Sequence, residues 1–204
     1  MHALIVLAHP DSYSLSHAIA AGIAEGITMF DAGNSFEIAD LTEEAFDPRF
    51  NEADIAAHRR KAEAPADVAV EQARIDRADA LVLVYPVYWW SMPALMKGWI
   101  DRVFANGWAY DDISGKVAKK LGHLSVHLVG IGGADARTYE RHGYFSAIKT
   151  QIDHGIFDYC GAPVMTSELL LDSDAGTGAV HIEMARRIGS NVFNAAGRAA
   201  SGAA

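Results

Sequence analysis

The chain has 204 residues, of which half are apolar, and a formal net charge of -9 at pH 7. This length fits one domain with enough chain for a three-layer core, so we expect a single domain over residues 1–204. The negative charge argues against binding to nucleic acid or anionic lipid, because those partners require clustered Lys and Arg. The only cysteine, Cys160, excludes an internal disulfide and is compatible with a reducing cytoplasm, where we expect the protein to act.

Five short apolar runs are predicted to be β-strands. They lie at Ala3–Ala8, Phe36–Leu41, Ala80–Tyr85, Leu124–Val129 and Val164–Leu171. The first run is short, lacks a basic start and stops at His9-Pro10, so we interpret it as a strand and not as a signal peptide. No apolar segment approaches the roughly 20 residues that a membrane-spanning helix needs.

Segments compatible with helices separate these strands. They lie at Ser16–Met29, Val68–Ala78, Pro93–Phe104, Tyr144–Tyr159 and Ala179–Ala196. This alternation predicts an α/β fold with a five-stranded parallel sheet covered by helices on both faces, in three layers. Five such strands allow the doubly wound, flavodoxin-like order 2-1-3-4-5, in which the loops after strands one, three and four meet. These three loops should therefore carry complementary chemistry.

The connection before the third strand is unusually long. Residues 47–66 contain Pro48, Asn51, a charged cluster and Pro65. Connections of this length are often functional or interfacial, and the alternative is a mobile surface insert. At the other end of the chain, the small residues Ala199–Ala204 are expected to fray.

The loop after the first strand, residues 9–17, places four hydroxyl side chains just before a helix. Backbone N–H groups at a helix N-terminus, assisted by serine hydroxyls and by His9, suit a phosphate dianion. The alternative is that Ser14 or Ser16 only caps the helix. Neither a Walker motif nor a GxGxxG motif follows this strand, which argues against a P-loop NTPase and a Rossmann dinucleotide site.

The loop after the third strand is rich in aromatic residues and reads Pro86-Val87-Tyr88-Trp89-Trp90-Ser91-Met92-Pro93. We expect Pro86 to end the strand pairing, Ser91 to cap the next helix and Pro93 to lie in its first turn. A planar heterocycle could hydrogen-bond the backbone amides of this loop and stack on its rings. The alternative is that Trp89 and Trp90 pack in the core or at a subunit contact.

The loop after the fourth strand combines glycines with hydrogen-bond donors. Gly132 and Gly133 permit close approach of a ligand, and Arg137, Tyr139 and His142 supply donors. A glycine-rich turn alone is weak evidence for a binding site. The sequence also indicates no metal site, because His123 and His127 could share a strand face but lack a third ligand.

Taken together, these motifs resemble the flavodoxin-like NAD(P)H:quinone oxidoreductases, a family that includes the DT-diaphorase type, small bacterial quinone reductases and potassium-efflux ancillary proteins. The resemblance rests on Leu7-Ala8-His9-Pro10 with Ser14 following, Asp79–Val82 leading into Pro86–Phe104, Gly107-Trp108-Ala109-Tyr110, Gly132-Gly133 and Tyr159-Cys160-Gly161. These stretches cover the chain from its start to about Leu171, and the segment beyond resembles the family poorly.

The resemblance implies an enzyme that uses a bound flavin to transfer hydride from NAD(P)H to quinones or similar flat acceptors by a ping-pong mechanism. The flavin phosphate would lie on the loop after the first strand, and the main-chain amides after the third strand would edge the isoalloxazine ring. Trp89 would form a wall of the substrate pocket. The implied flavin-binding residues are His9, Ser14, Leu15, Ser16, Pro86, Val87, Tyr88, Trp89, Trp90, Gly132 and Gly133.

The resemblance also implies two catalytic residues, Tyr139 and His142, which would stabilise negative charge on the reduced flavin. In the DT-diaphorase type the histidine lies six residues beyond the tyrosine, whereas this chain has Phe145 there and His142 only three residues beyond. If His142 does not stabilise the reduced flavin, Tyr139 and backbone amides would still supply much of the stabilisation.

Several alternatives stay open at this stage. The cofactor can be FAD or FMN, and the His9-Pro10 loop and the long insert favour FAD; the choice between NADH and NADPH and the physiological acceptor are undecided. The resemblance implies a homodimer whose partner completes each active site. The main rival function is a flavin-binding ancillary subunit that regulates a potassium-efflux transporter. A flavodoxin-like electron carrier and a doubly wound domain without flavin are further alternatives.

Overall fold

The computed structural model describes residues 1–112, 115–171 and 178–194. Five parallel strands form its main sheet in the order β2-β1-β3-β6-β7, which confirms the predicted 2-1-3-4-5 arrangement. The strands are β1 (His2–Leu7), β2 (Ser35–Asp40), β3 (Ala80–Pro86), β6 (Ser125–Gly132) and β7 (Val164–Leu171). Each lies within a few residues of its predicted range. Two short strands, β4 (Tyr110–Asp111) and β5 (Ala118–Lys119), pair separately in an antiparallel ribbon.

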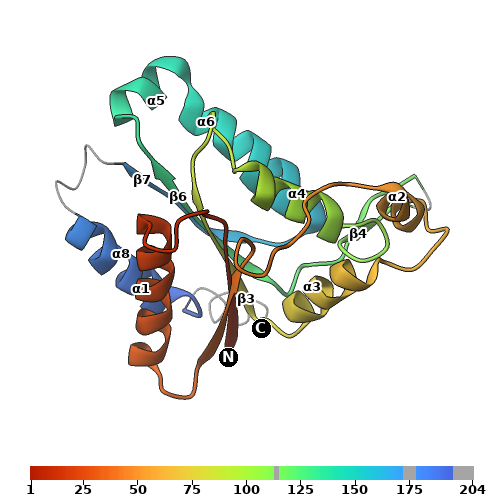
Figure 1. The fold of residues 1–204 in the computed structure, drawn as a ribbon, viewed down its shortest axis with the longest axis horizontal. Helices are drawn as coiled ribbons and strands as arrows, with labels where there is room; N and C mark the ends of the chain where they lie inside the picture. The colour runs from red at the N-terminus through yellow and green to blue at the C-terminus, as the bar shows by residue number, and fades with distance from the viewer. Residues whose placement is uncertain (113–114, 172–177, 195–204) are drawn as a thin grey trace, which may run out of the picture.

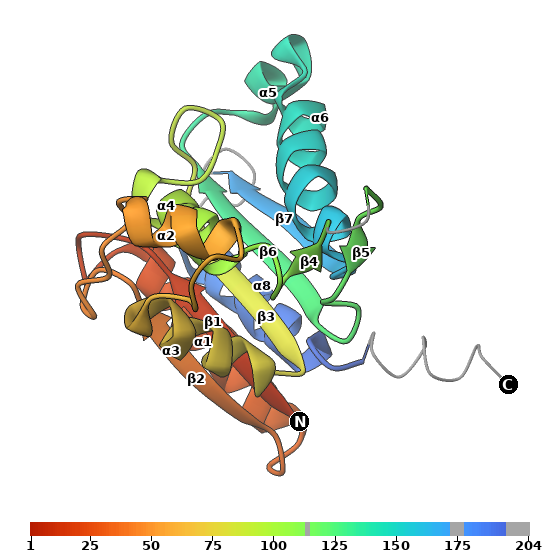
Figure 2. The ribbon, with the colours of Figure 1, turned by 90° about the vertical axis from the view of Figure 1, so that its right-hand side faces the viewer.

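Helices cover both faces of this sheet, as Figure 1 shows. Helices α1 (Leu15–Phe30) and α8 (Gly178–Asn191) pack together on one face. The other face carries α3 (Ala66–Asp76), α4 (Ala94–Val103), α6 (Tyr144–Ile148) and the π-helix η1 (Lys149–Asp158), as seen in Figure 2. The molecule therefore has the predicted three layers.

The buried strands explain why their sequences show no polar alternation. In β1, Leu4 and Val6 join the core under α3 and α4, whereas Ile5 joins the core under α1 and α8. In β3, Leu81 and Val82 divide between the two cores in the same way. Successive strand residues point to opposite faces, so a sheet covered on both sides requires apolar residues at every position.

Pro86 ends β3, as predicted, but it still takes part in the strand pairing. Pro86 is the last residue of β3 and lies opposite Ile131 of β6. Pairing of β3 with β1 already stops at Val84, opposite Leu7. The missing N–H of Pro86 points to the side where β1 has ended, so no ladder bond is lost, and the next residue, Val87, donates its N–H to the Ile131 carbonyl at 2.8 Å.

The predicted start of the following helix is also corrected. Helix α4 begins at Ala94, and Pro93 is its N-cap residue and not part of its first turn. Ser91 does not cap this helix. Its hydroxyl instead donates a hydrogen bond to Gln151 Oε1 at 2.6 Å, which ties the aromatic loop to the π-helix.

The long connection between β2 and β3 contains an ordered helix, α2 (Glu52–His58), which begins with a capping box between Asn51 and Asp54. Arg102 of α4 holds this segment. Its guanidinium contacts Asp54 at 3.0 Å and Asp67 at 2.6 Å. Because Arg102 and Asp54 are both buried, the connection is fixed to the core rather than a mobile insert.

Two helices were not expected: α2, in the connection between β2 and β3, and α5, after the fourth strand of the main sheet. Residues read from the sequence as a loop after the fourth strand contain α5 (Ala136–His142), which Asp135 caps by accepting the Thr138 N–H and which ends at Gly143 in the left-handed region. The predicted helix at Tyr144–Tyr159 is present as α6 continued by η1. The expected fraying of Ala199–Ala204 concerns residues outside the described part of the chain. Among the described residues, no helix is long and apolar enough to span a membrane.

Candidate functional site

The loop between β1 and α1 presents the N-terminus of a helix at the carboxyl edge of the sheet. Ser14 is the N-cap of α1, and its hydroxyl oxygen accepts the His17 N–H at 3.4 Å. The N–H groups of Leu15 and Ser16 lie in the first turn, where a helix offers them no acceptor. Ser14 therefore caps the helix, and the two following amides are still available to an anion.

His9 and His17 lie close together in this part of the structure. Asp11 donates its N–H to His9 Nδ1 at 3.0 Å, and the two imidazole rings meet edge to face with centroids 6.4 Å apart. His17 bridges two elements, because its Nδ1 lies 2.8 Å from Ser14 Oγ and its Nε2 lies 2.8 Å from Asp40 Oδ2 at the end of β2. His17 and Asp40 were not singled out from the sequence.

The loop between β3 and α4 contains a tight two-residue turn. Tyr88 and Ser91 exchange two backbone hydrogen bonds, at 3.0 and 3.1 Å, across Trp89 and Trp90. Both tryptophans have positive φ, +49° and +63°, a region that usually requires Gly or Asn. Such strain persists only where the surroundings impose it, and it gathers at ligand sites. The central amides of a turn of this kind find no acceptor across it, so they can face a ligand.

The two tryptophans have different surroundings. The Trp90 ring stacks on Tyr144 with centroids 3.7 Å apart and meets Tyr139 edge to face at 5.2 Å. Trp89 is 93 % exposed. Packing in the core therefore accounts for Trp90 only in part and does not account for Trp89.

The loop between β6 and α5 completes a small cavity with this turn. A methyl group on Gly132 would lie 2.5 Å from the Tyr139 hydroxyl oxygen, so Gly132 must be glycine for the phenol to lie there. Gly133 has open space at the same position, with no atom within 4 Å. The cavity has a volume of about 240 Å³ and is lined by Val87, Trp89, Trp90, Gly133, Ala134 and Tyr139.

Tyr139 and His142, both predicted to be catalytic, lie in different environments. Tyr139 is 1 % exposed, and burial raises the pKa of its phenol above the ordinary value of 10.0, so the hydroxyl stays protonated at neutral pH. His142 lies exposed at the end of α5 with its ring 5.4 Å from that of Tyr144, and it is not among the residues that line the cavity. The geometry brings Tyr139, but not His142, to the cavity.

The three loops predicted to meet follow β1, β3 and β6, which are neighbours in the sheet. Because parallel strands end at the same edge, the helix terminus after β1 lies beside the cavity formed by the other two loops. Tyr144, Ala134, His17 and Asp40 are site residues that the sequence interpretation missed. Only Asp40 carried a signal, since it lies near the carboxyl end of the predicted strand Phe36–Leu41, at this edge of the sheet. The described residues contain no group of three or more His, Cys, Asp or Glu suited to a metal ion.

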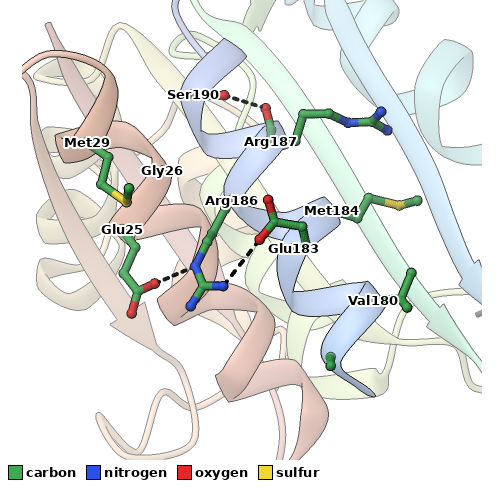
Figure 3. A pocket seen from close by; sticks show the side chains of 10 residues that line it. Glu25, Gly26, Met29, Val180, Glu183, Met184, Arg186, Arg187 and Ser190 are labelled. Atoms are coloured by element: carbon green, nitrogen blue, oxygen red, sulfur yellow. Dashed lines mark hydrogen bonds and ion pairs between the residues drawn. The ribbon is translucent and has the colours of Figure 1, made fainter. Parts of the chain in front are cut away.

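A larger groove of about 980 Å³ lies elsewhere, between α1 and α8 (Figure 3). Three of its charged side chains form ion pairs, as Arg186 contacts Glu25 at 2.8 Å and Glu183 at 3.4 Å. Met29, Val180 and Met184 supply apolar surface. None of the three loops contributes to this groove, so volume alone does not make it the site.

A family model described as "Flavodoxin-like fold" matches residues 1–188. The chain belongs to this flavodoxin-like family. It is 32 % identical, over 173 residues, to an uncharacterized NAD(P)H oxidoreductase of Haemophilus influenzae, with 84 % of each chain covered. The match confirms the family resemblance that the sequence motifs indicated.

Further comparisons agree with this family. The structure superposes on an NAD(P)H:quinone oxidoreductase from Methanothermobacter marburgensis with a TM-score of 0.84 and 27 % identity, covering 94 % of this chain and 98 % of the other. A shorter match, 46 % identical over 70 residues, joins 34 % of this chain to 38 % of the glutathione-regulated potassium-efflux system ancillary protein KefF of an Enterobacter species.

Proposed function

We propose that this protein is a flavin-dependent NAD(P)H:quinone-type oxidoreductase. The observation that carries the proposal is the strained turn at Trp89 and Trp90, whose free amides edge the same cavity as Gly133 and Tyr139. A cavity with hydrogen-bond donors along one rim and aromatic rings along its walls suits a flat heterocycle. The names of the relatives, an NAD(P)H oxidoreductase and an NAD(P)H:quinone oxidoreductase, support the same reaction class.

The residues present fit a flavin. The N–H groups of Leu15 and Ser16 and the hydroxyl of Ser14 offer donors for its phosphate, at the positive end of the α1 dipole. The amides of the Trp89-Trp90 turn offer donors for the ring edge. Gly133 leaves space where any side chain would project, so a ring can approach the backbone there. His9 would lie beside the phosphate.

When bound, the flavin accepts a hydride from the reduced nicotinamide and passes two electrons to the acceptor. The protein's own residues orient the ring and exclude water from it. Tyr139 keeps its proton at neutral pH because it is buried, so its hydroxyl can donate to an oxygen that becomes negative on reduction. Trp90 and Tyr144 hold the turn against α5 and α6, while Trp89 is free to contact the substrate.

The proposal also covers the cofactor, the kinetic mechanism and the oligomeric state. The cofactor is FAD or FMN, with FAD favoured by the His9-Pro10 loop and the β2–β3 connection that resemble the DT-diaphorase type. Reductant and acceptor use one stacking slot in turn, in a ping-pong mechanism. The protein acts as a homodimer in which the exposed Trp89 and Tyr88 lie near the partner, since a monomer would leave these rings in water.

A second candidate function rests on the match to the potassium-efflux ancillary protein KefF. In this alternative the chain binds flavin but serves to regulate a membrane transporter. Co-purification with a potassium-efflux transporter would support it, whereas unchanged transport in membranes that lack this protein would contradict it.

Two measurements test the main proposal. The purified protein should show the absorption bands of an oxidised flavin, and chromatography of the released cofactor should identify it as FAD or FMN. Initial rates with NAD(P)H and a quinone should give parallel double-reciprocal lines. A colourless protein that binds neither flavin contradicts the proposal as a whole, and intersecting lines contradict only the ping-pong order.

A further inference from the structure

The hydrogen-bond chain Ser14–His17–Asp40 links the N-terminus of α1 to the end of β2. Asp40 fixes the proton on one ring nitrogen of His17. Its Oδ2 lies 2.8 Å from His17 Nε2, and its Oδ1 accepts the Thr42 N–H at 3.0 Å. An ionised carboxylate only accepts hydrogen bonds, so Nε2 must carry a proton.

The state of Ser14 follows from this tautomer. A neutral imidazole protonated at Nε2 has an acceptor at Nδ1, which lies 2.8 Å from Ser14 Oγ. The single hydroxyl proton of Ser14 is therefore donated to His17. In this state the hydroxyl presents only lone pairs to a phosphate at the helix N-terminus, and lone pairs repel an anion.

Protonation of His17 reverses this arrangement. With a proton on Nδ1, the imidazolium donates to Ser14 Oγ, which already accepts the His17 N–H at 3.4 Å. Both lone pairs of the hydroxyl are then occupied, and its proton turns outward to the phosphate. The imidazolium would then lie between the carboxylate of Asp40, 2.8 Å from Nε2, and the bound anion.

We propose that His17 is a positioning residue which takes up a proton when the flavin phosphate binds, and so switches Ser14 from acceptor to donor. The inference rests on the proposed flavin site and adds a proton to its binding equilibrium. The ionisable side chains that face His17 from the elements around it, within the described part of the chain, are Asp40 and His9. His9 accepts the Asp11 N–H at its own Nδ1, so that nitrogen is already engaged.

Calorimetry of apo-protein with FAD, and separately with FMN, tests this inference. Titrations at about pH 8, where imidazoles are ordinarily neutral, are repeated in buffers of different ionisation enthalpy. We expect uptake of close to one proton per flavin and an affinity that falls by up to about tenfold per pH unit on the alkaline side. His17→Asn should bind flavin more weakly, without proton uptake and without this pH dependence. If His17 had a purely structural role, His17→Asn would lower the flavin affinity equally at every pH.

Two further variants sharpen the test. Asp40→Asn removes the counter-charge of the imidazolium and should reduce the proton uptake even if His17→Asn folds poorly. His2→Asn is the matched control, because His2 makes a similar bond to Ser35 Oγ, at 2.9 Å, at the opposite edge of the sheet. It should leave the uptake unchanged. Flavin binding by the wild type without proton uptake, or equal uptake in His17→Asn, overturns the inference alone. Absence of flavin binding overturns it together with the proposed function.

Discussion

At the scale of single residues, Tyr139 joins a buried ring to a hydroxyl at the cavity. Its phenylalanine variant keeps the ring contacts with Trp90 and Phe145 and removes only the O–H donor. We expect Tyr139→Phe to bind flavin normally and to be reduced by NAD(P)H roughly ten to a hundred times more slowly, because a donor to developing charge is lost. Stopped-flow absorbance measures this rate, with Tyr159→Phe as the control outside the cavity.

The pH dependence of flavin reduction follows from the direction in which burial shifts the pKa of Tyr139. Because burial raises the pKa of the phenol, the donor stays present as the pH rises toward the ordinary value of 10.0. The ratio of wild-type to Tyr139→Phe reduction rates should therefore stay constant between neutral pH and about pH 9. A ratio that shrinks toward unity across that range would show that the phenol had lost its proton.

Gly132 and Gly133 form a matched pair of neighbouring positions. A methyl group on Gly132 would lie 2.5 Å from the Tyr139 oxygen and 2.8 Å from Leu171, whereas one on Gly133 meets no atom within 4 Å. Gly132→Ala should lower the free energy of unfolding by about 1–3 kcal/mol through overpacking. Gly133→Ala should change it by less than about 0.5 kcal/mol and weaken flavin binding instead. Urea unfolding and a flavin titration separate the two effects, and equal destabilisation of both variants would contradict this account.

At the scale of elements, the buried pair Arg102–Asp54 fixes the β2–β3 connection to α4. Asp54→Ala leaves the buried guanidinium without its buried carboxylate partner and should cost about 3–5 kcal/mol of unfolding free energy. Asp67 contacts the same guanidinium, but its side chain is 49 % exposed. Asp67→Ala should therefore cost less than about 1 kcal/mol. Similar losses in the two variants, measured by urea unfolding, would contradict the idea that burial decides the effect.

The sequence predicts elements better than it predicts their ends. Apolar runs predicted all five strands of the main sheet. The signal was strongest in β1 and β3, which are buried on both faces, and weaker in the edge strands β2 and β7, which are partly exposed. The role of Pro86 depended on where β1 stops, which is set by pairing between distant segments. Helix α5 was missed, although Asp135 and Gly143 mark its ends, because glycines before it suggested a loop. The positive φ of Trp89 and Trp90 had no sequence signal, since no composition rule expects bulky residues there.

The hydrogen bonds of His17 could not be predicted from the sequence for a similar reason. Ser14 and His17 are three residues apart, but Asp40 joins them only through the pairing of β1 with β2, in which Leu7 lies opposite Asp40. Sequence motifs therefore pointed to the loop proposed to hold the phosphate, whereas the contact between His17 and Asp40 depends on tertiary structure.

At the scale of the whole molecule, His127 links the sheet to the residue that follows α8 and makes stability depend on pH. It is buried between Thr166 and the Val192 carbonyl, and desolvation lowers its pKa to about 4. The unfolded chain binds this proton at higher pH than the folded chain does, so the stability is present above about pH 6.5 and is lost as the pH falls. Between pH 7 and 5 this group alone should remove about 2 kcal/mol. Urea unfolding should show that His127→Gln loses less unfolding free energy than the wild type between pH 7 and 5. An equal loss in the two proteins would mean that other groups cause the pH dependence.

The three layers of the fold bring the loops after β1, β3 and β6 to one edge, and the central claim is that a flavin lies across them. A crystal structure of the protein grown with FAD tests this claim most directly. We predict the ring against the amides of Trp89 and Trp90, its pyrimidine end toward Gly133 and Tyr139, and its phosphate at Ser14 and the start of α1. Flavin bound in the groove between α1 and α8 would contradict the account. So would the absence of flavin, at saturating FAD, from the edge of the sheet where the parallel strands end.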